Sequence, residues 1–203
     1  MIVVIDYGMG NLASVVNAIM RFTKDVLISA KPGDIIKADK LILPGVGAFG
    51  HALREIDARG QRASILKFVA SGRPFLGICL GMHLLFTNSC EGGKHAGFGV
   101  VKGDVLPFSP APGFKVPHMG WNTVSGPALN ECPLFKGISD NVYMYFVHSY
   151  YAVPDDKKLS LGVTDYNGDF CSVIQKDNIY AVQFHPEKSQ GPGLKVIENF
   201  VRL

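Results

Sequence analysis

The first half of the chain alternates short apolar runs with segments of helical periodicity, and this alternation limits the possible folds more than any other feature. The runs lack the polar alternation of a half-exposed strand, as expected of strands buried on both faces, and lie at residues 2–5, 26–28, 41–43 and 75–78. Apolar residues at helical spacing from Leu12 to Ile19, after Asn11 as N-cap, predict one helix, and residues 61–71 predict another. We therefore expect an α/β fold with a central, mostly parallel sheet and helices on both faces.

From Gly97 onward the pattern changes to short strands separated by turn signals. The predicted strands are residues 143–147, 161–164, 170–174 and 179–184. Residues 166–169 and 176–178 have the composition of hairpin turns, and the proline-rich stretch 107–117 predicts a loop or a sheet edge. No linker or repeat interrupts the chain. The expectation is a single domain over residues 1–203 with an antiparallel β extension.

Composition and charge exclude several classes of protein. A chain of 203 residues that is 47% apolar, with a net charge of only +3, is not disordered. Four cysteines in a core of this size indicate reduced thiols and not a disulfide scaffold. We find no basic stripe for nucleic acid, no signal peptide and no membrane span, so a cytoplasmic location is expected.

Residues 75–82 carry the strongest chemical signal, because a buried strand enters Gly77-Ile78-Cys79-Leu80-Gly81 and then a helix. This is the pattern of a nucleophile elbow, in which the glycines permit a sharp turn. The helix N-terminus favours a thiolate at Cys79, and the Leu80 N–H can stabilise an oxyanion. Cys79 could instead be a small buried apolar residue, but a plain core strand is weakened by each glycine. The elbow therefore favours a catalytic cysteine.

A thiol nucleophile needs a base, and His185 is the histidine best placed to supply it. Pro186 keeps His185 extended, so that His185 and Glu187 point in the same direction. The carboxylate would then orient the imidazole and stabilise its protonated form. By itself, the tripeptide fits a surface turn better. Together with the elbow, it predicts a Cys79–His185–Glu187 triad.

A second glycine-rich loop, residues 43–49, follows another predicted strand and should emerge at the same edge of the sheet as Cys79. The Val46–Gly47 peptide could supply a second oxyanion N–H, although an ordinary strand–helix turn explains the loop equally well. No phosphate-binding motif is present. Cys79 and His83 are spaced as on one helix face, but further zinc ligands are missing. We expect neither a metal nor a cofactor.

These motifs together resemble class I, triad-type glutamine amidotransferases. Further stretches narrow the resemblance to the HisH family, the glutaminase subunits of imidazole glycerol phosphate synthase; the matching stretches are residues 5–11, 43–49, 118–122, 145–150 and 185–190. The resemblance runs from residue 2 to the last helix. It implies a class I glutamine amidotransferase-like fold and hydrolysis of L-glutamine to glutamate and ammonia.

The resemblance also implies roles for individual residues. Cys79 would form a thioester, and His185, oriented by Glu187, would protonate ammonia and then activate water. Leu80 and the Val46–Gly47 peptide would stabilise the oxyanion once the loop reorients. The positions matching the family's glutamine-holding residues are Gly47, Glu91, Ser149 and Tyr150.

His83 departs from the family, which ordinarily has a substrate-holding glutamine at this position. A histidine can still donate a hydrogen bond, but its charge depends on pH. The resulting hypothesis is that His83 binds the α-carboxylate of glutamine, and that affinity weakens as pH rises above the His83 pKa.

The resemblance implies a (β/α)8-barrel synthase subunit as partner in a heterodimer. Ammonia would pass to it through a closed channel, and it would make imidazole glycerol phosphate and an aminoimidazole carboxamide ribotide for histidine biosynthesis. Residues 117–122, expected to form a loop with Trp121, are the candidate docking surface, although Trp121 could equally pack in the core. The isolated chain should have little activity, because the oxyanion loop must reorient.

Three alternatives remain open at this stage. A paralogous subunit could deliver ammonia to another acceptor synthase, such as one that amidates surface sugars. A different cysteine hydrolase could share the elbow, but it should lack the paired His-Pro-Glu sequence. A non-catalytic interaction module could keep the fold, although an intact triad argues against it.

Overall fold

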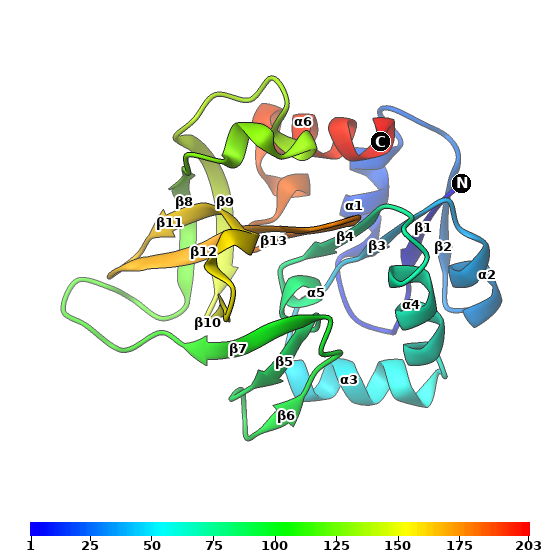
Figure 1. Cartoon of the computed structure of the whole chain (residues 1–203), viewed down its shortest axis with the longest axis horizontal. Helices are drawn as coiled ribbons and strands as arrows, with labels where there is room; N and C mark the ends of the chain where they lie inside the picture. Colours follow the sequence, from blue (N-terminus) through cyan, green and yellow to red (C-terminus); the bar gives the residue numbers. More distant parts are fainter.

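The computed structural model describes all 203 residues and contains one large sheet of eleven strands (Figure 1). The strand order is β2-β1-β3-β4-β13-β12-β10-β7-β5-β6, with β11 paired to β12. Its strands are β1 (Ile2–Ile5), β2 (Val26–Ser29), β3 (Lys40–Leu43), β4 (Phe75–Ile78), β5 (Phe86–Ser89), β6 (His95–Ala96), β7 (Val101–Pro107), β10 (Tyr150–Pro154), β11 (Ser160–Asp165), β12 (Asp169–Lys176) and β13 (Ile179–Val182).

The five neighbours β2, β1, β3, β4 and β13 pair in parallel. Two helices cover one face of the sheet and three cover the other; these are α1 (Leu12–Ile19) and α6 (Gln190–Arg202), then α2 (Pro32–Lys37), α3 (Phe49–Ala58) and α4 (Arg62–Val69). Strand β1 shows why helices cover both faces of the sheet, because Ile2 and Val4 belong to the apolar cluster on one face while Val3 and Ile5 belong to the cluster on the other. The predicted α/β sheet with helices on both faces is confirmed.

The sheet continues into antiparallel strands beyond β13, as the turn sequences predicted. Asn167 and Gly168 between β11 and β12 have φ values of 57° and 110°, and Asp177 between β12 and β13 has a φ of 51°. Asn, Gly and Asp are the residues that tolerate these values. The strand predicted over 179–184 ends earlier, at Val182, because the chain leaves the sheet toward His185.

A separate two-stranded sheet, made of β8 (His118–Val124) and β9 (Val142–His148), was not expected from residues 117–122. The loop prediction for this segment is wrong. The prolines end at Pro117, and the seven residues after it can pair in register with β9. Met119, Trp121 and Tyr143 are among the exposed large apolar residues of the chain. We call this two-stranded unit the outer hairpin; one of its faces is open to solvent.

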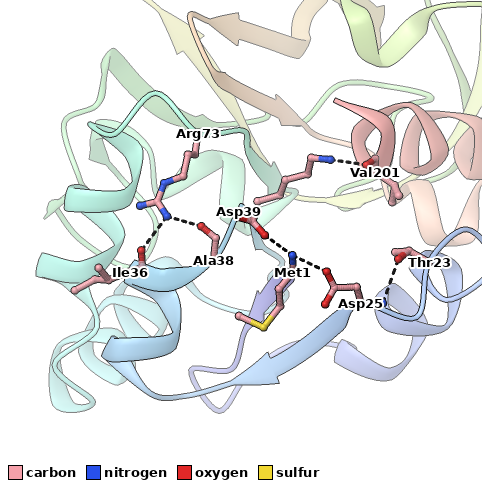
Figure 2. A network of polar contacts seen from close by, with 9 residues as sticks. Met1, Thr23, Asp25, Ile36, Ala38, Asp39, Arg73 and Val201 are labelled. Atoms are coloured by element: carbon pink, nitrogen blue, oxygen red, sulfur yellow. Dashed lines mark hydrogen bonds and ion pairs between the residues drawn. The ribbon is translucent and has the colours of Figure 1, made fainter.

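The amino ends of the parallel strands are joined by a network of polar contacts (Figure 2). The amino group of Met1 pairs with Asp25, at 2.6 Å, and with Asp39. The Arg73 guanidinium donates to the carbonyls of Ile36 and Ala38. We call Met1, Asp25, Asp39 and Arg73 the amino-end cluster. No helix of the structure combines the length and apolar character needed to cross a membrane.

Candidate active site

Cys79 lies at the carboxyl end of β4, in a sharp turn before the short helix α5 (Leu80–His83). Its φ of 52° is in the left-handed region, which a cysteine adopts only when its surroundings impose it. The glycines of the elbow permit close packing. A Cβ on Gly81 would meet the Leu43 carbonyl oxygen at 1.8 Å, and one on Gly77 would meet the Gly81 oxygen at 2.8 Å. The predicted strand–turn–helix geometry is therefore present.

His185 and Glu187 form a buried pair next to this turn. The distance from His185 Nδ1 to Glu187 Oε1 is 2.8 Å, and both side chains are 2% exposed. Strand pairing brings the pair to Cys79, since β13 lies beside β4 and the Cys79 N–H donates to the Val182 carbonyl. The other ring nitrogen of His185, Nε2, has no hydrogen-bond partner within the chain. It is free to exchange a proton with a reacting group.

Electrostatics favour the protonated form of His185. Burial by itself lowers the pKa of the imidazole, but the neighbouring Cys79 and Glu187 more than offset this and raise it to about 10. The ring is then an imidazolium at neutral pH, stabilised by the Glu187 carboxylate and by the neighbouring Cys79. This is the charge distribution that a thiol nucleophile requires.

Strand β9 of the outer hairpin holds the His185 segment in place. The His185 N–H donates to the Tyr145 carbonyl at 2.9 Å. The Ser189 hydroxyl accepts from the Tyr145 N–H at 2.9 Å and donates to the His185 carbonyl at 2.7 Å. The outer hairpin is therefore bonded to the backbone of the candidate base.

Gln183 is a site residue that the sequence reasoning missed. It is fully buried, and its Nε2 donates to the Cys79 sulfur at 3.7 Å. Its Oε1 accepts from His83 Nε2 at 2.6 Å, which fixes the orientation of the amide. A usable signal was present in the sequence, because Gln183 and His185 are two residues apart in extended backbone and point in the same direction.

His83 makes its observed hydrogen bond to Gln183, and burial lowers its pKa to about 4. The ring is therefore neutral from pH 6 to 9. Deprotonation of His83 is therefore not expected to change glutamine affinity in this range, because the desolvated ring has already lost its charge, and a dependence of affinity on the His83 pKa stays a prediction. Binding of glutamine by neutral His83 stays a prediction.

A cavity of about 520 Å³ opens in front of Cys79, which is a typical size for a small-molecule site. Its walls bring together every residue predicted to hold substrate or oxyanion; the lining residues are Val46, Gly47, Cys79, Leu80, His83, Glu91, Pro117, Val147, His148, Ser149, Tyr150 and Lys188. His185 and Glu187 are not among them, and both side chains are buried.

The loop before α3 is anchored at both ends. At its start, the buried Tyr7 hydroxyl donates to the Pro44 carbonyl at 3.0 Å. At its end, the Phe49 N–H donates to the Glu91 carboxylate at 3.0 Å. Between these anchors Gly47 has a φ of 93°, a value that glycine adopts readily. The Val46–Gly47 peptide is thus the adjustable part of a loop with fixed ends.

Glu91 is half-buried, and burial raises the pKa of its carboxyl even though the Phe49 N–H and His95 act in the opposite direction. The Phe49 N–H donates to Oε2 of this carboxylate. A carboxylate in such a cavity gains most from a cationic ligand, such as an ammonium group. No group of three or more His, Cys, Asp or Glu side chains is placed to hold a metal ion.

The chain matches known families over its whole length. Residues 3–203 of the chain match the protein family described as glutamine amidotransferase class-I. The chain is 49% identical over 205 residues to imidazole glycerol phosphate synthase subunit HisH of Sulfurimonas denitrificans, covering 100% of this chain and 98% of the relative. It is 48% identical to the HisH subunit of Methanocaldococcus jannaschii, with both chains fully covered.

Solved structures share the fold. A crystal structure of a glutamine amidotransferase superposes with a TM-score of 0.76 at 16% identity, covering 99% of each chain. The family match over residues 3–203 and the relatives of 48–49% identity show that the chain belongs to the class I glutamine amidotransferase family and, within it, to the HisH subunits of imidazole glycerol phosphate synthase.

Proposed function

We propose that this chain hydrolyses L-glutamine to glutamate and ammonia and delivers the ammonia to the synthase subunit of imidazole glycerol phosphate synthase. The observation that carries the proposal is the meeting of Cys79, in its strained turn, with the buried His185–Glu187 pair at a cavity lined by Glu91, Ser149 and Tyr150. The names of the HisH relatives support a role in histidine biosynthesis over a paralogous acceptor.

In the first step, the Cys79 thiolate attacks the side-chain carbonyl carbon of glutamine. The carbon–nitrogen bond then breaks and leaves a γ-glutamyl thioester on the sulfur. The leaving nitrogen takes a proton from His185 Nε2, so ammonia departs and the imidazole becomes neutral. Glu187 holds Nδ1 and keeps Nε2 directed at the reaction.

In the second step, neutral His185 removes a proton from water, and the resulting hydroxide attacks the thioester carbon. Glutamate leaves, and the thiolate and imidazolium are restored. Both tetrahedral intermediates carry a negative oxygen, which would accept from the Leu80 N–H at the start of α5 and from the Val46–Gly47 peptide after it reorients. Gln183 would hold the sulfur in place throughout.

Recognition of glutamine needs one group for its ammonium and others for its carboxylate. Glu91 provides the negative charge in the cavity, while Gly47, Ser149 and Tyr150 provide polar groups for the other end. Residues 1–203 would act as one catalytic unit, as the family match to residues 3–203 supports. No cofactor enters these steps.

The open face of the outer hairpin is the proposed docking surface for a (β/α)8-barrel synthase subunit in a heterodimer. Met119 is 62% exposed, Tyr143 60% and Trp121 46%. Exposed aromatic residues and methionine on a small sheet have the composition of an interface core. Lys188 extends this surface, since its ammonium lies 5.8 Å from the Tyr145 ring and also lines the cavity. Ammonia leaving the cavity would therefore meet the partner directly.

The test is covalent labelling with the glutamine analogue 6-diazo-5-oxo-L-norleucine, read by mass spectrometry, together with a glutaminase assay. We expect one adduct on Cys79, protection by L-glutamine, and strong activation of hydrolysis by the synthase subunit with its acceptor. Labelling that glutamine does not block would indicate another cysteine hydrolase. A complex that neither labels nor hydrolyses glutamine would indicate a non-catalytic module.

A further inference from the structure

Two buried histidines that the mechanism does not use join the outer hairpin to the glutamine site. His118 begins β8, His148 ends β9, and the two are register partners. They are 3% and 6% exposed, and the distance from His118 Nδ1 to His148 Nε2 is 2.9 Å. Both belong to stretches that the sequence singled out without assigning them a role.

The hydrogen bonds around the pair define one proton arrangement. His148 Nδ1 lies 2.8 Å from the Tyr150 carbonyl oxygen, which can only accept, so Nδ1 carries the hydrogen. In a neutral ring Nε2 must then accept from His118 Nδ1. His118 Nε2 in turn accepts from Asn122 Nδ2 at 3.2 Å. Donation therefore runs in one direction, from Asn122 through both rings to Tyr150.

The surroundings keep both rings uncharged. Aromatic rings surround the pair, including Phe108, Phe146 and Phe170. Burial lowers the pKa of His118 to about 4 and lowers that of His148 well below its usual value. The pair thus acts through hydrogen bonds of fixed direction and not through charge.

The two ends of this chain of hydrogen bonds lie at functional surfaces. His118 is followed by Met119, and Asn122 follows Trp121, so one end lies in the strand of the proposed docking face. His148 lines the cavity and precedes Ser149 and Tyr150, two of the predicted glutamine-binding residues. A shift of β8 on docking would therefore reach the turn that holds glutamine.

We infer that His118 and His148 are positioning residues, which set the Ser149–Tyr150 turn for glutamine and couple its geometry to the docked state of the outer hairpin. The inference rests on the proposed function. Neither residue touches reacting atoms. A purely structural pair would change stability when removed, without changing how substrate affinity depends on the partner.

The first test does not depend on activity. ¹⁵N–¹H correlation spectra of the complex at pH 7 should show both rings as neutral Nδ1–H tautomers, while the exposed His51 serves as the reference histidine. An Nε2–H tautomer or a charged ring at His148 would break the arrangement and overturn the inference.

The second test uses two substitutions of His148 in the complex with its synthase subunit. His148→Phe removes both hydrogen bonds, and we expect the KM for glutamine to rise about 10-fold while kcat changes less than about 3-fold. An asparagine amide can occupy the position of the Nδ1–H group, so His148→Asn should keep the bond to Tyr150 and lose only the link to His118. It should keep the KM of the isolated chain but reduce activation by the partner about 10-fold.

His51→Ala is the matched control and should behave as wild type in every assay. Unchanged activation in His148→Asn, or a loss in kcat with unchanged KM in His148→Phe, would overturn the inference. Affinity for the synthase subunit should stay within about 2-fold, which separates coupling from docking. If the wild-type complex hydrolysed no glutamine, the proposed function would fail first. Calorimetric binding of L-glutamine to the complex of Cys79→Ser, with and without His148→Phe, would then decide the positioning role.

Discussion

The two ends of the parallel strands carry charged groups in opposite environments. At the amino ends, the carboxylates of Asp25 and Asp39 are 69% and 77% exposed where they pair with the Met1 amino group (Figure 2). At the carboxyl ends, His185 and Glu187 are 2% exposed. The same sheet supports both sets, so the difference comes from solvent access and not from the fold.

The two ends therefore affect different properties of the protein: the exposed amino ends affect stability slightly, and the buried carboxyl ends affect catalysis. Water screens the amino-end cluster, so its ion pairs change the free energy of unfolding little. Burial at the carboxyl ends strengthens each interaction and lowers the pKa of His83 to about 4, while Cys79 and Glu187 overcome the effect of burial on His185 and raise its pKa to about 10. Substitutions at the carboxyl ends should therefore change activity strongly, while those at the amino ends should change only stability, and slightly.

The largest effect is expected for Cys79→Ala, which should reduce glutamine hydrolysis by about 10⁴-fold or more because no nucleophile remains. Cys79→Gly should be equally inactive. Its free energy of unfolding should be about 1 kcal/mol higher than that of Cys79→Ala, because glycine adopts the positive φ of residue 79 without strain. Steady-state assays and urea unfolding measure the two quantities. Equal stability of the variants would show that the turn stores no strain.

Glu187→Gln should come next, with kcat lower by about 10²-fold or more, since the amide neither stabilises the imidazolium nor enforces its tautomer. Glu187 contributes to raising the pKa of His185, so the substitution lowers that pKa. As pH rises, His185 then loses its proton earlier than in the wild type. The alkaline limb of the kcat profile should therefore move toward lower pH. A limb that stays in place would mean that His185 is not the proton donor.

Gln183→Leu should lower kcat by about 10-fold, because the sulfur loses a donor and His83 Nε2 loses its acceptor. Gln175→Leu, on the neighbouring strand β12, is the matched control and should keep wild-type activity. Thermal unfolding of both variants separates a local effect at Cys79 from loss of the fold. Equal kcat values for the two variants would remove Gln183 from the site.

Trp121→Ala should weaken binding of the synthase subunit by about 30-fold, as expected for a central aromatic residue of an interface, without changing the basal activity of the isolated chain. Phe22→Ala, which removes another exposed aromatic ring, is the control. Calorimetric titration measures both affinities. If both substitutions weakened binding equally, the outer hairpin would not be the docking surface.

The smallest effect is expected for Asp39→Asn in the amino-end cluster. Asp25 and Asp39 raise the pKa of the Met1 amino group, so the contribution of this group to stability is lost as pH rises through its pKa in the folded protein. The pKa of Asp39 is lowered by the Met1 amino group, so its contribution is lost as pH falls through the folded value. The ordinary pKa values of Asp39 and of the amino group are 3.8 and 8.0. Between these two pH values, Asp39→Asn should lower Tm slightly and leave activity unchanged.

The control for Asp39→Asn is Asp169→Asn, which makes the same change in charge at an exposed residue outside the amino-end cluster. A loss of activity in Asp39→Asn alone would contradict the separation of the two ends.

Local sequence patterns anticipated much of the site. The glycines around Cys79 and the proline after His185 act through backbone geometry that extends over only a few residues, so the sharp turn and the His185–Glu187 pair could be predicted. Gln183 was missed because its role depends on His83 and Cys79, which are 100 and 104 residues away along the chain. In the outer hairpin, β9 was predicted and β8 was missed, because β8 pairs with a strand that lies beyond the long connection between Val124 and Val142.

The sequence by itself determined the layered sheet, the elbow and the family, since apolar periodicity, glycine positions and short motifs are local properties. Only the tertiary structure decided which side chains lie in low dielectric. It placed His83 where burial removes its charge, and His185 where two neighbours restore it. Burial and long-range contacts belong to the packed chain, so the charge states of these two histidines could not be deduced from the order of their residues.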